Sequence, residues 1–273
     1  MQKIHIKSFP LGRWALIAIT LIWFALLILV PVGGLIQKLL ASPIGEILKG
    51  LGSKAAVNAF LLTAKVSLIT ILVNTVMGVL IARVLVRQEF RGKLLLEGLI
   101  DLPFAISPVV AGFMIVILFG PSGWLGGWLE GFGVKVVYSL PGIVLATIFV
   151  TLPFVAKEVI PVYRQFGMRS EEAAQVMGAS QRQTFWWITL PSIKWGVIYG
   201  VTLALARSLG EFGAVLVVSG NIIHQTQTAT LYIHQQFTDF DYTSAYAASL
   251  VIAATAFTIL IVIQTIANRH REV

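Results

Sequence analysis

Long apolar runs, separated by short polar segments, are the main feature of this chain of 273 residues. A helix needs about 20 mostly apolar residues to cross a bilayer, and six runs reach that length. They cover residues 14–36, 57–85, 94–119, 141–160, 191–218 and 244–267. The pattern therefore predicts an all-α fold, a polytopic transmembrane helical bundle with six spans.

The third run carries an internal break signal. Its sequence DLPFAISPVVAGF contains Pro103 and Pro108, and each proline lacks a backbone donor and crowds the preceding turn. Inside a bilayer, a broken backbone is tolerated only where protein or a water-filled cavity covers it. We therefore expect an interrupted span, with Asp101, Pro103 and Pro108 as candidates for a transport pathway or gate.

Composition supports the same class of protein. Hydrophobic residues make up 57% of the chain and charged residues 12%, about half of the roughly 25% that soluble domains carry. The first run exceeds twenty residues, whereas the apolar core of a signal peptide has about 7–15. We expect a tail at 1–13, a transmembrane domain at 14–267 and a tail at 268–273.

Basic residues fall unevenly on the two sides of the predicted bundle. Outside the apolar runs or within a few residues of their ends, Lys and Arg number fourteen on the side of the two termini and four on the other side. The positive-inside rule therefore places both termini and the 164–190 segment in the cytoplasm. Because the net charge of +8 follows this topology, we expect the lipid bilayer of the cytoplasmic (inner) membrane as a partner and no nucleic acid.

Several kinds of chemistry are excluded by what the sequence lacks. It contains no cysteine and no GxxxxGK[ST] pattern, so disulfides, thiol catalysis, Cys-based metal sites and a P-loop ATP site are absent. An intramembrane hydrolase needs a nucleophile and a base at one depth, but all four histidines lie outside the runs or at their ends. We expect no catalytic residue, no metal and no cofactor. The histidines are His5, His224, His234 and His270.

A polar stretch between the fourth and fifth runs reads EEAAQVMGASQRQTFWWITLP and covers residues 171–191. Ser170 is a suitable N-cap, and Glu171 and Glu172 would complement the positive end of a helix dipole. Gly178 can adopt the left-handed conformation that ends a helix. The stretch therefore predicts a short helix that ends at a glycine corner.

A second short helix and the entry into the next span follow. Ser180 and Gln183 form a capping-box pattern, and Pro191 suits the first turn of a helix. Ala173 and Ala174 leave room for a partner surface to approach. The residues alone leave two interpretations open: an element that inserts into a cleft of a cytoplasmic protein, or an amphipathic helix on the bilayer surface.

The stretch resembles the EAA motif of ABC importer permeases, which reads Glu-Ala-Ala, three residues, Gly, nine residues, Ile, one residue, Leu-Pro. Every position of the motif is filled here. The resemblance implies a type I ABC importer permease fold and a coupling helix, within 164–190, that docks on a separate ABC ATPase subunit, where ATP is bound. The ATPase-coupling residues are then Glu172, Ala173, Ala174, Gly178, Ile188, Leu190 and Pro191, with the neighbouring Glu171.

Three further segments narrow the resemblance. DLPFAISPVVAG at 101–112, GPSGWLGGWL at 120–129 and ARSLGEFGAVLVVSGN at 206–221 are similar to the sulfate/thiosulfate and molybdate permeases. DLPFA with SPVVAG, and FDY at 240–242, look most like the W-type subunits of sulfate importers. One departure is Arg91, where that family usually has proline.

This resemblance implies a non-enzymatic, membrane-spanning subunit of an ATP-driven oxyanion importer. Sulfate or thiosulfate is the expected cargo, and molybdate or tungstate is the alternative. The implied partners are ABC ATPase subunits, a second homologous permease subunit (in a heterodimer, or alternatively a homodimer) and an extracytoplasmic sulfate-binding protein, which would meet the outward segment 219–243. From another class, an ion-gradient-driven secondary transporter would usually show internal repeats, and we find no convincing second copy.

Polar and small residues inside two spans are further candidates for the pathway. Gly196, Gly200 and Ala204 share one helix face with Arg207, Ser208 and Glu211. Charges at depth are rare and normally face the protein interior or a pathway, so two roles remain: Arg207 eases the passage of an oxyanion, or it pairs with Glu211 alone. Asn74 belongs to a polar stripe on the second run, where we expect helix–helix hydrogen bonding ahead of a pathway wall.

Overall fold

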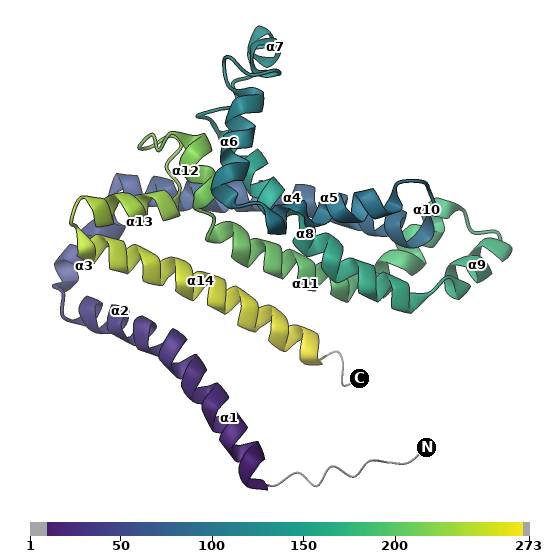
Figure 1. Ribbon diagram of the computed structural model, residues 1–273, viewed down its shortest axis with the longest axis horizontal. Helices are drawn as coiled ribbons and strands as arrows, with labels where there is room; N and C mark the ends of the chain where they lie inside the picture. Colours follow the sequence, from purple (N-terminus) through teal and green to yellow (C-terminus); the bar gives the residue numbers. More distant parts are fainter. Residues whose placement is uncertain (1–9, 270–273) are drawn as a thin grey trace.

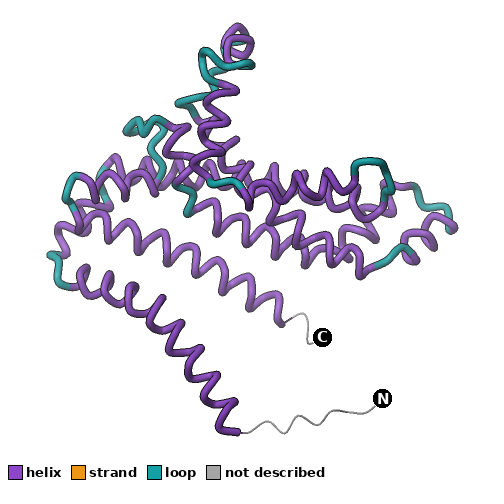
Figure 2. The backbone as a smooth tube through the Cα atoms, viewed as in Figure 1, coloured by secondary structure: helices purple, strands orange, loops and turns teal. Residues whose placement is uncertain are grey.

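The computed structural model of the protein describes residues 10–269, and all its regular elements within that range are helical. Figure 1 shows the helices along the chain, and Figure 2 shows that only short loops connect them. The elements are α1 Pro10–Phe24, η1 Ala25–Leu29, α2 Val30–Leu40, α3 Ile44–Leu51, α4 Lys54–Arg87, α5 Lys93–Ala105, α6 Pro108–Phe119, α7 Gly126–Gly131, α8 Leu140–Phe166, α9 Arg169–Val176, α10 Gln181–Thr184, η2 Phe185–Thr189, α11 Leu190–Leu209, α12 Gly213–Ser219, α13 Ala229–Thr238 and α14 Tyr242–Arg269.

Three long helices, α4, α8 and α11, form the centre of the bundle. Their main buried cluster joins α4, α8 and α11 through small and β-branched side chains, which allow the helices to approach closely. Its buried members are Val79, Ala82, Val155, Val159, Tyr163, Ile193 and Ala204. In Figure 1, α14 runs beside α11, with α9 and α10 at one end of the bundle and α3 and α13 at the other.

Five helices are long and apolar enough to cross a membrane, or six if a bent pair counts as one span. The five are Trp14–Leu40, Lys54–Arg87, Leu140–Phe166, Gln181–Leu209 and Tyr242–Ile266. The bent pair is α5 and α6, whose axes differ by 111°. The predicted all-α bundle with interrupted third span is therefore confirmed.

The break in the third span comes from Pro108 and not from Pro103. Pro108 is the first residue of α6. The residue before it, Ser107, has ψ of 136°, because a proline pushes the preceding residue out of the helical region. Pro103 lies within α5. The prediction that both prolines interrupt the span was thus wrong for Pro103, and α6 leaves the bundle as a separate helix (Figure 1).

The fifth span differs from the predicted 191–218 at both ends. Helical structure begins at Gln181 and α11 ends at Leu209, after which α12 starts at Gly213. The N-cap of α12 is Phe212, and the carboxylate of the preceding Glu211 (Oε1) accepts a hydrogen bond from the Ala214 N–H at 3.0 Å. A polar residue within the apolar run therefore pairs one of the N–H groups that the start of a helix leaves without a partner.

Two π-helical segments precede prolines by the same spacing. The segment η1 ends two residues before Pro31, and η2 ends two residues before Pro191. A proline in an α-helix clashes with the carbonyl four residues earlier, and a wider π turn relieves that crowding. The chain from Gln181 therefore continues into α11 without a stop.

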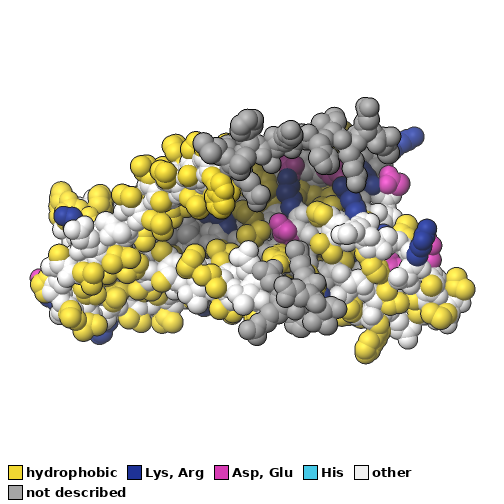
Figure 3. Space-filling view, turned by 90° about the horizontal axis from the view of Figure 1, so that it is seen from below, with side chains coloured by type: hydrophobic (Ala, Val, Ile, Leu, Met, Phe, Trp, Pro, Cys, Tyr) yellow, Lys and Arg dark blue, Asp and Glu magenta, His cyan; other side chains and the backbone are white. Residues whose placement is uncertain are grey.

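Figure 3 shows one face of the molecule, turned from the view of Figure 1. Hydrophobic side chains cover much of the left part, and Lys, Arg, Asp and Glu gather toward the right end, which is where α9 and α10 lie. In the first span, none of the most apolar stretch of 18 residues is buried against the rest of the chain. Such a surface needs lipid or another apolar surface to cover it.

Candidate functional site

The polar stretch between the fourth and fifth spans forms the predicted first helix and glycine corner, but the helix begins earlier than expected and the second helix continues into α11. The helix α9 begins at Arg169 after Met168, so Ser170 lies inside the first turn and is not the N-cap. Gly178 has φ of +91°, the left-handed conformation expected at a helix end. The Ser180–Gln183 capping box is present in both directions, at 3.3 Å and 2.8 Å.

Glu171 faces the bundle. Its Oε2 atom lies 2.8 Å from Arg87 Nε. Its Oε1 atom accepts hydrogen bonds from Thr189 Oγ1 at 2.5 Å and from the Tyr163 hydroxyl at 3.2 Å. Arg87 Nη2 donates to Gly167 O, and the Arg87 guanidinium lies 4.3 Å from the Tyr163 ring centroid. The Arg87 Nε contact is at ion-pair distance without hydrogen-bond alignment, so its attraction is ionic.

This Glu171 cluster, formed by Arg87, Tyr163, Glu171 and Thr189, connects four elements. Arg87 ends α4, Tyr163 lies near the end of α8, and Thr189 ends η2, just before α11. The Arg87 and Glu171 side chains are each only 12% exposed. Because little water screens such a pair, α9 is attached to the three central helices rather than hanging from its two loops.

The opposite face of α9 is open. Glu172 and Ala173 are exposed, and Val176 and Met177 are exposed to 88% and 82%. Ala174, by contrast, is buried against the bundle. The exposed face therefore combines one carboxylate with small and apolar side chains, which suits insertion into a cleft of another protein.

The last three motif residues position the start of α11. Ile188 and Leu190 are half-buried, and Leu190 packs against the main buried cluster. Pro191 is exposed in the first turn of α11. Ile188 and Leu190 therefore pack the segment that follows α9 against the bundle. Being half-buried, they offer little exposed surface to a partner protein.

Arg207 and Glu211 form the ion pair that their spacing predicts. Arg207 Nη1 lies 2.7 Å from Glu211 Oε2, with the Arg207 side chain 34% exposed and that of Glu211 1% exposed. The Oε2 atom has no aligned hydrogen bond, so this contact too is mainly ionic. Ser208 is buried and donates to Leu205 O at 2.8 Å, so it does not join the pair.

A cavity of about 450 Å³ lies at the break between α5 and α6. Arg207 is its charged residue, and Pro103 and Pro108 both line it. Asp101 lies just before this break and pairs with Lys157 Nζ at 2.6 Å. Three of the seven pathway candidates therefore line this cavity, and Glu211 is paired with Arg207. The three are Pro103, Pro108 and Arg207.

Asn74 and the small residues of α11 lie away from that cavity. Asn74 is buried, and its Nδ2 donates to Thr151 Oγ1 at 2.8 Å, which is the helix–helix contact that we expected. Gly196 and Gly200 are buried against α8, where a Cβ on Gly200 would lie 2.7 Å from Val155 Cα. These residues set the distance between helices.

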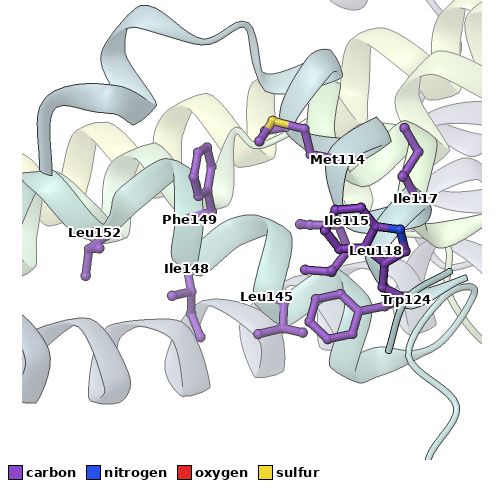
Figure 4. Close-up of a pocket in the computed structure, with 11 residues that line it drawn as sticks. Met114, Ile115, Ile117, Leu118, Trp124, Leu145, Ile148, Phe149 and Leu152 are labelled. Carbon is purple, nitrogen blue, oxygen red and sulfur yellow. The ribbon is translucent and has the colours of Figure 1, made fainter. Parts of the chain in front are cut away.

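A larger hollow of about 580 Å³ lies between α6 and α8 and is almost wholly apolar. Figure 4 shows Met114, Ile115 and Phe149 among the side chains around it. It holds no charged side chain, so it suits an acyl chain or an apolar protein surface rather than an anion. Of these two cavities, the smaller one, with Arg207, has chemistry for a charged solute.

Sequence reasoning missed Arg87, Tyr163, Thr189 and Lys157. Arg87 and Lys157 were counted only as topology charges, and Tyr163 and Thr189 lie just outside the fourth and fifth runs and fill no position of the motif. One signal was available: Glu171 and Ala174 are three residues apart and share a helix face, while Glu172 lies on another. Among the described residues, no group of three His, Asp or Glu is placed to hold a metal ion.

Fold and site together define a helical membrane protein of the permease type with an exposed short helix, α9, at one end of its bundle. Residues 74–272 match the model of the family described as binding-protein-dependent transport system inner membrane component. The chain therefore belongs to this family of transport-system membrane subunits.

Curated relatives extend the likeness over nearly the whole chain. The sulfate transport system permease protein CysW of Synechocystis sp. is 41% identical over 96% of this chain and 95% of its own length. CysW of Synechococcus elongatus is 44% identical over 90% and 86%. CysT, the sulfate transport system permease protein of Escherichia coli strain K12, is 36% identical over 92% and 90%.

A solved structure shows the same fold. It is a bacterial ABC transporter involved in the import of the acidic polysaccharide alginate, with a TM-score of 0.78 and 22% identity over 94% of this chain and 95% of that chain. A second structure of the bacterial alginate transporter, also at a TM-score of 0.78, contains an alginate pentasaccharide-bound periplasmic protein. The predicted ABC importer permease fold is confirmed.

Proposed function

We propose that this chain is a permease subunit of an ATP-driven importer that carries sulfate or thiosulfate across the cytoplasmic membrane. The observation that carries this proposal is the 41% identity to a CysW sulfate permease over 96% of the chain. A second permease of the CysT kind would complete a heterodimer, since CysT is also similar over most of its length. The chain itself binds no ATP.

The exposed face of α9 is the docking surface for the ATPase subunit in this proposal. Glu172, Ala173, Val176 and Met177 present a charge and apolar area on a rigid helix. When the ATPases close on ATP, α9 is displaced, and the Glu171 cluster passes that displacement to α4, α8 and α11. A helix held by several contacts transmits movement, whereas one on loose loops would absorb it.

The other end of the bundle is where an external binding protein would dock. The 219–243 segment forms α13 and two tight turns, and Asp241 caps α14 by accepting from Ser244 N at 3.1 Å and Ser244 Oγ at 2.6 Å. His224 contacts Asn58 at 3.0 Å. The positive-inside count supports this orientation, with both termini and α9 in the cytoplasm.

The test is reconstitution in liposomes with the cognate ATPase, second permease and binding protein. We expect ATP-dependent uptake of radiolabelled sulfate, with thiosulfate as a competitor. Uptake of molybdate but not sulfate would move the chain to the molybdate importers. Sulfate uptake by the chain alone, driven by an ion gradient without ATPase, would overturn the proposal.

A further inference from the structure

Charged side chains of the spanning helices meet along the contact between α5 and α8. Asp101 Oδ1 lies 2.6 Å from Lys157 Nζ, and Glu97 Oε1 lies 3.2 Å from Arg164 Nη2. Because α5 and α8 run in opposite directions, the second pair lies about one to two turns nearer the α9 end than the first. We name these four residues the α5–α8 charged seam.

The Asp101–Lys157 pair of this seam lies at a depth in the membrane where contact with lipid is unfavourable for charged groups. Lys157 is nine residues before the end of α8 at Phe166, or roughly 13 Å at 1.5 Å per residue. Its side chain is 46% exposed and that of Asp101 54% exposed in the single chain. Ionised groups at such depth face a protein interior or a water-filled route, so this side of the chain is turned away from the acyl chains.

Lys157 does not extend toward the cytoplasmic end of α8, as a lysine that reaches for the membrane surface would. Its Nζ is held at Asp101 and lies 5.0 Å from the ring centroid of Phe104, which is three residues further outward on α5. The ammonium group is therefore kept at depth by two contacts.

A pair of aromatic rings lies beside this lysine and along the cavity that contains Arg207. Phe104 and Phe154 meet edge to face, with centroids 5.4 Å apart and planes at 73°. Phe154 precedes Lys157 by three residues and Phe104 follows Asp101 by three, so the ring pair lies one turn outward of the Lys157–Asp101 pair. Both rings line the cavity that contains Arg207.

We infer that Lys157 is a second cationic station for the transported dianion, with the Phe104–Phe154 pair as the barrier between it and Arg207. This inference rests on the proposed function. An anion in the outer cavity meets Arg207 and then, when the rings separate, Lys157. Each cation already has a carboxylate partner, Glu211 or Asp101, so the anion displaces a partner instead of binding a bare charge.

The pairing of each cation with a carboxylate suits a site through which an anion passes better than a site that binds the anion tightly. Conduction requires a site that is favourable enough to enter and weak enough to leave, and a competing carboxylate weakens each station. The rings add a closed, apolar step between two charged ones, so the anion is not in contact with both cations while the rings are together. The prediction is a cargo-specific role for Lys157 that a purely structural ion pair would not have.

The experiment uses the reconstituted four-component importer with the double substitution Asp101→Asn and Lys157→Gln, which removes both charges and leaves no lone one. We expect sulfate uptake per complex to fall about tenfold or more, since a contact with a charged group is lost, while ATP hydrolysed per sulfate rises by a similar factor. Lys157→Arg should restore uptake in the presence of Asp101. The control is the double substitution Glu89→Gln and Lys93→Gln, which removes an ion pair of 2.7 Å at the start of α5 and should leave uptake unchanged.

Wild-type uptake by the Asp101→Asn, Lys157→Gln double variant at an equal amount of complex would overturn the inference and leave the proposed function standing. Absence of sulfate uptake by the wild-type complex would instead reject the proposed function. If the double variant assembles poorly, Ala105→Cys gives a second measurement, because Ala105 lines the cavity and the natural chain has no cysteine. A water-borne thiol reagent should modify it in at least one nucleotide state, and no reaction in any state would overturn the inference.

Discussion

Two adjacent carboxylates of α9 have different surroundings. Successive helical residues differ by about 100° around the axis, so Glu171 turns toward Arg87 while Glu172 is exposed. In the proposed function the two carboxylates therefore have different roles: Glu171 attaches α9 to its own chain, and Glu172 contacts the ATPase.

A matched pair of substitutions separates these roles. Glu171→Ala leaves Arg87 without its counter-charge in a place that is 12% exposed, so we expect the permease in detergent to lose about 3 kcal/mol of stability. Glu172→Ala should leave that stability unchanged and reduce the amount of ATPase that co-purifies. Thermal unfolding and a pull-down measure the two effects. A reversed result, in which Glu172→Ala destabilises the permease and Glu171→Ala does not, would show that the faces are misassigned.

At the residue scale, the sequence predicted local conformations better than contacts. Gly178 and the Ser180–Gln183 box follow from rules on a few neighbouring residues, and both were confirmed. The partners of Glu171 lie on three other helical segments, with Tyr163 8 residues and Thr189 18 residues away and Arg87 much further, so rules on a few neighbouring residues could not name them. The Arg207–Glu211 pair was predictable because both residues lie on one helix.

At the scale of elements, small residues decide how closely the central helices pack. Gly200 on α11 faces the backbone of α8, and a Cβ there would lie 2.7 Å from Val155 Cα. Backbone atoms cannot rotate away as a side chain can. The two helices would have to separate, and the buried cluster between them would open.

Gly200→Ala is therefore expected to destabilise the permease by about 1–3 kcal/mol, the usual cost of overpacking. The loss should appear as a lower thermal midpoint in detergent and less assembled complex. Gly45→Ala is the control, because Gly45 is helical and has no atom within 4 Å of an added Cβ. Equal stability of both variants would contradict the close packing of α8 and α11.

The positions of the helix breaks were only partly predictable. Pro108 broke the third span as expected, while Pro103 stayed within α5. An interior proline costs a helix one hydrogen bond, which the chain accepts where packing holds the helix together. The break after Leu209 has no proline, and the Glu211 carboxylate beside it accepts a hydrogen bond from the Ala214 N–H in the first turn of α12, so a hydropathy pattern alone could not reveal it.

At the scale of the whole molecule, orientation is the property on which the docking assignments depend. The uneven distribution of Lys and Arg predicts that α10 is cytoplasmic and that the segment before α8 is external. Arg182 and Lys135 are exposed residues in these two places.

Single cysteines test this orientation directly, because the natural chain has none to remove. Arg182→Cys should react with a membrane-impermeant thiol reagent only in inside-out vesicles, and Lys135→Cys only in right-side-out vesicles. Labelling of whole cells and of inverted membranes measures both. The opposite pattern would place α9 outside the cell and remove the ATPase from the docking face.

The Asp101–Lys157 pair also has a consequence for how cells make this subunit. A copy synthesised without its companions would leave two half-exposed charges against hydrocarbon, at a cost that assembly removes. Orphan copies should then be recognised as faulty and degraded, so balanced production of all subunits becomes a condition for accumulation. The exposure of Asp101 and Lys157 would in this way mark a subunit that has not been assembled into the complex.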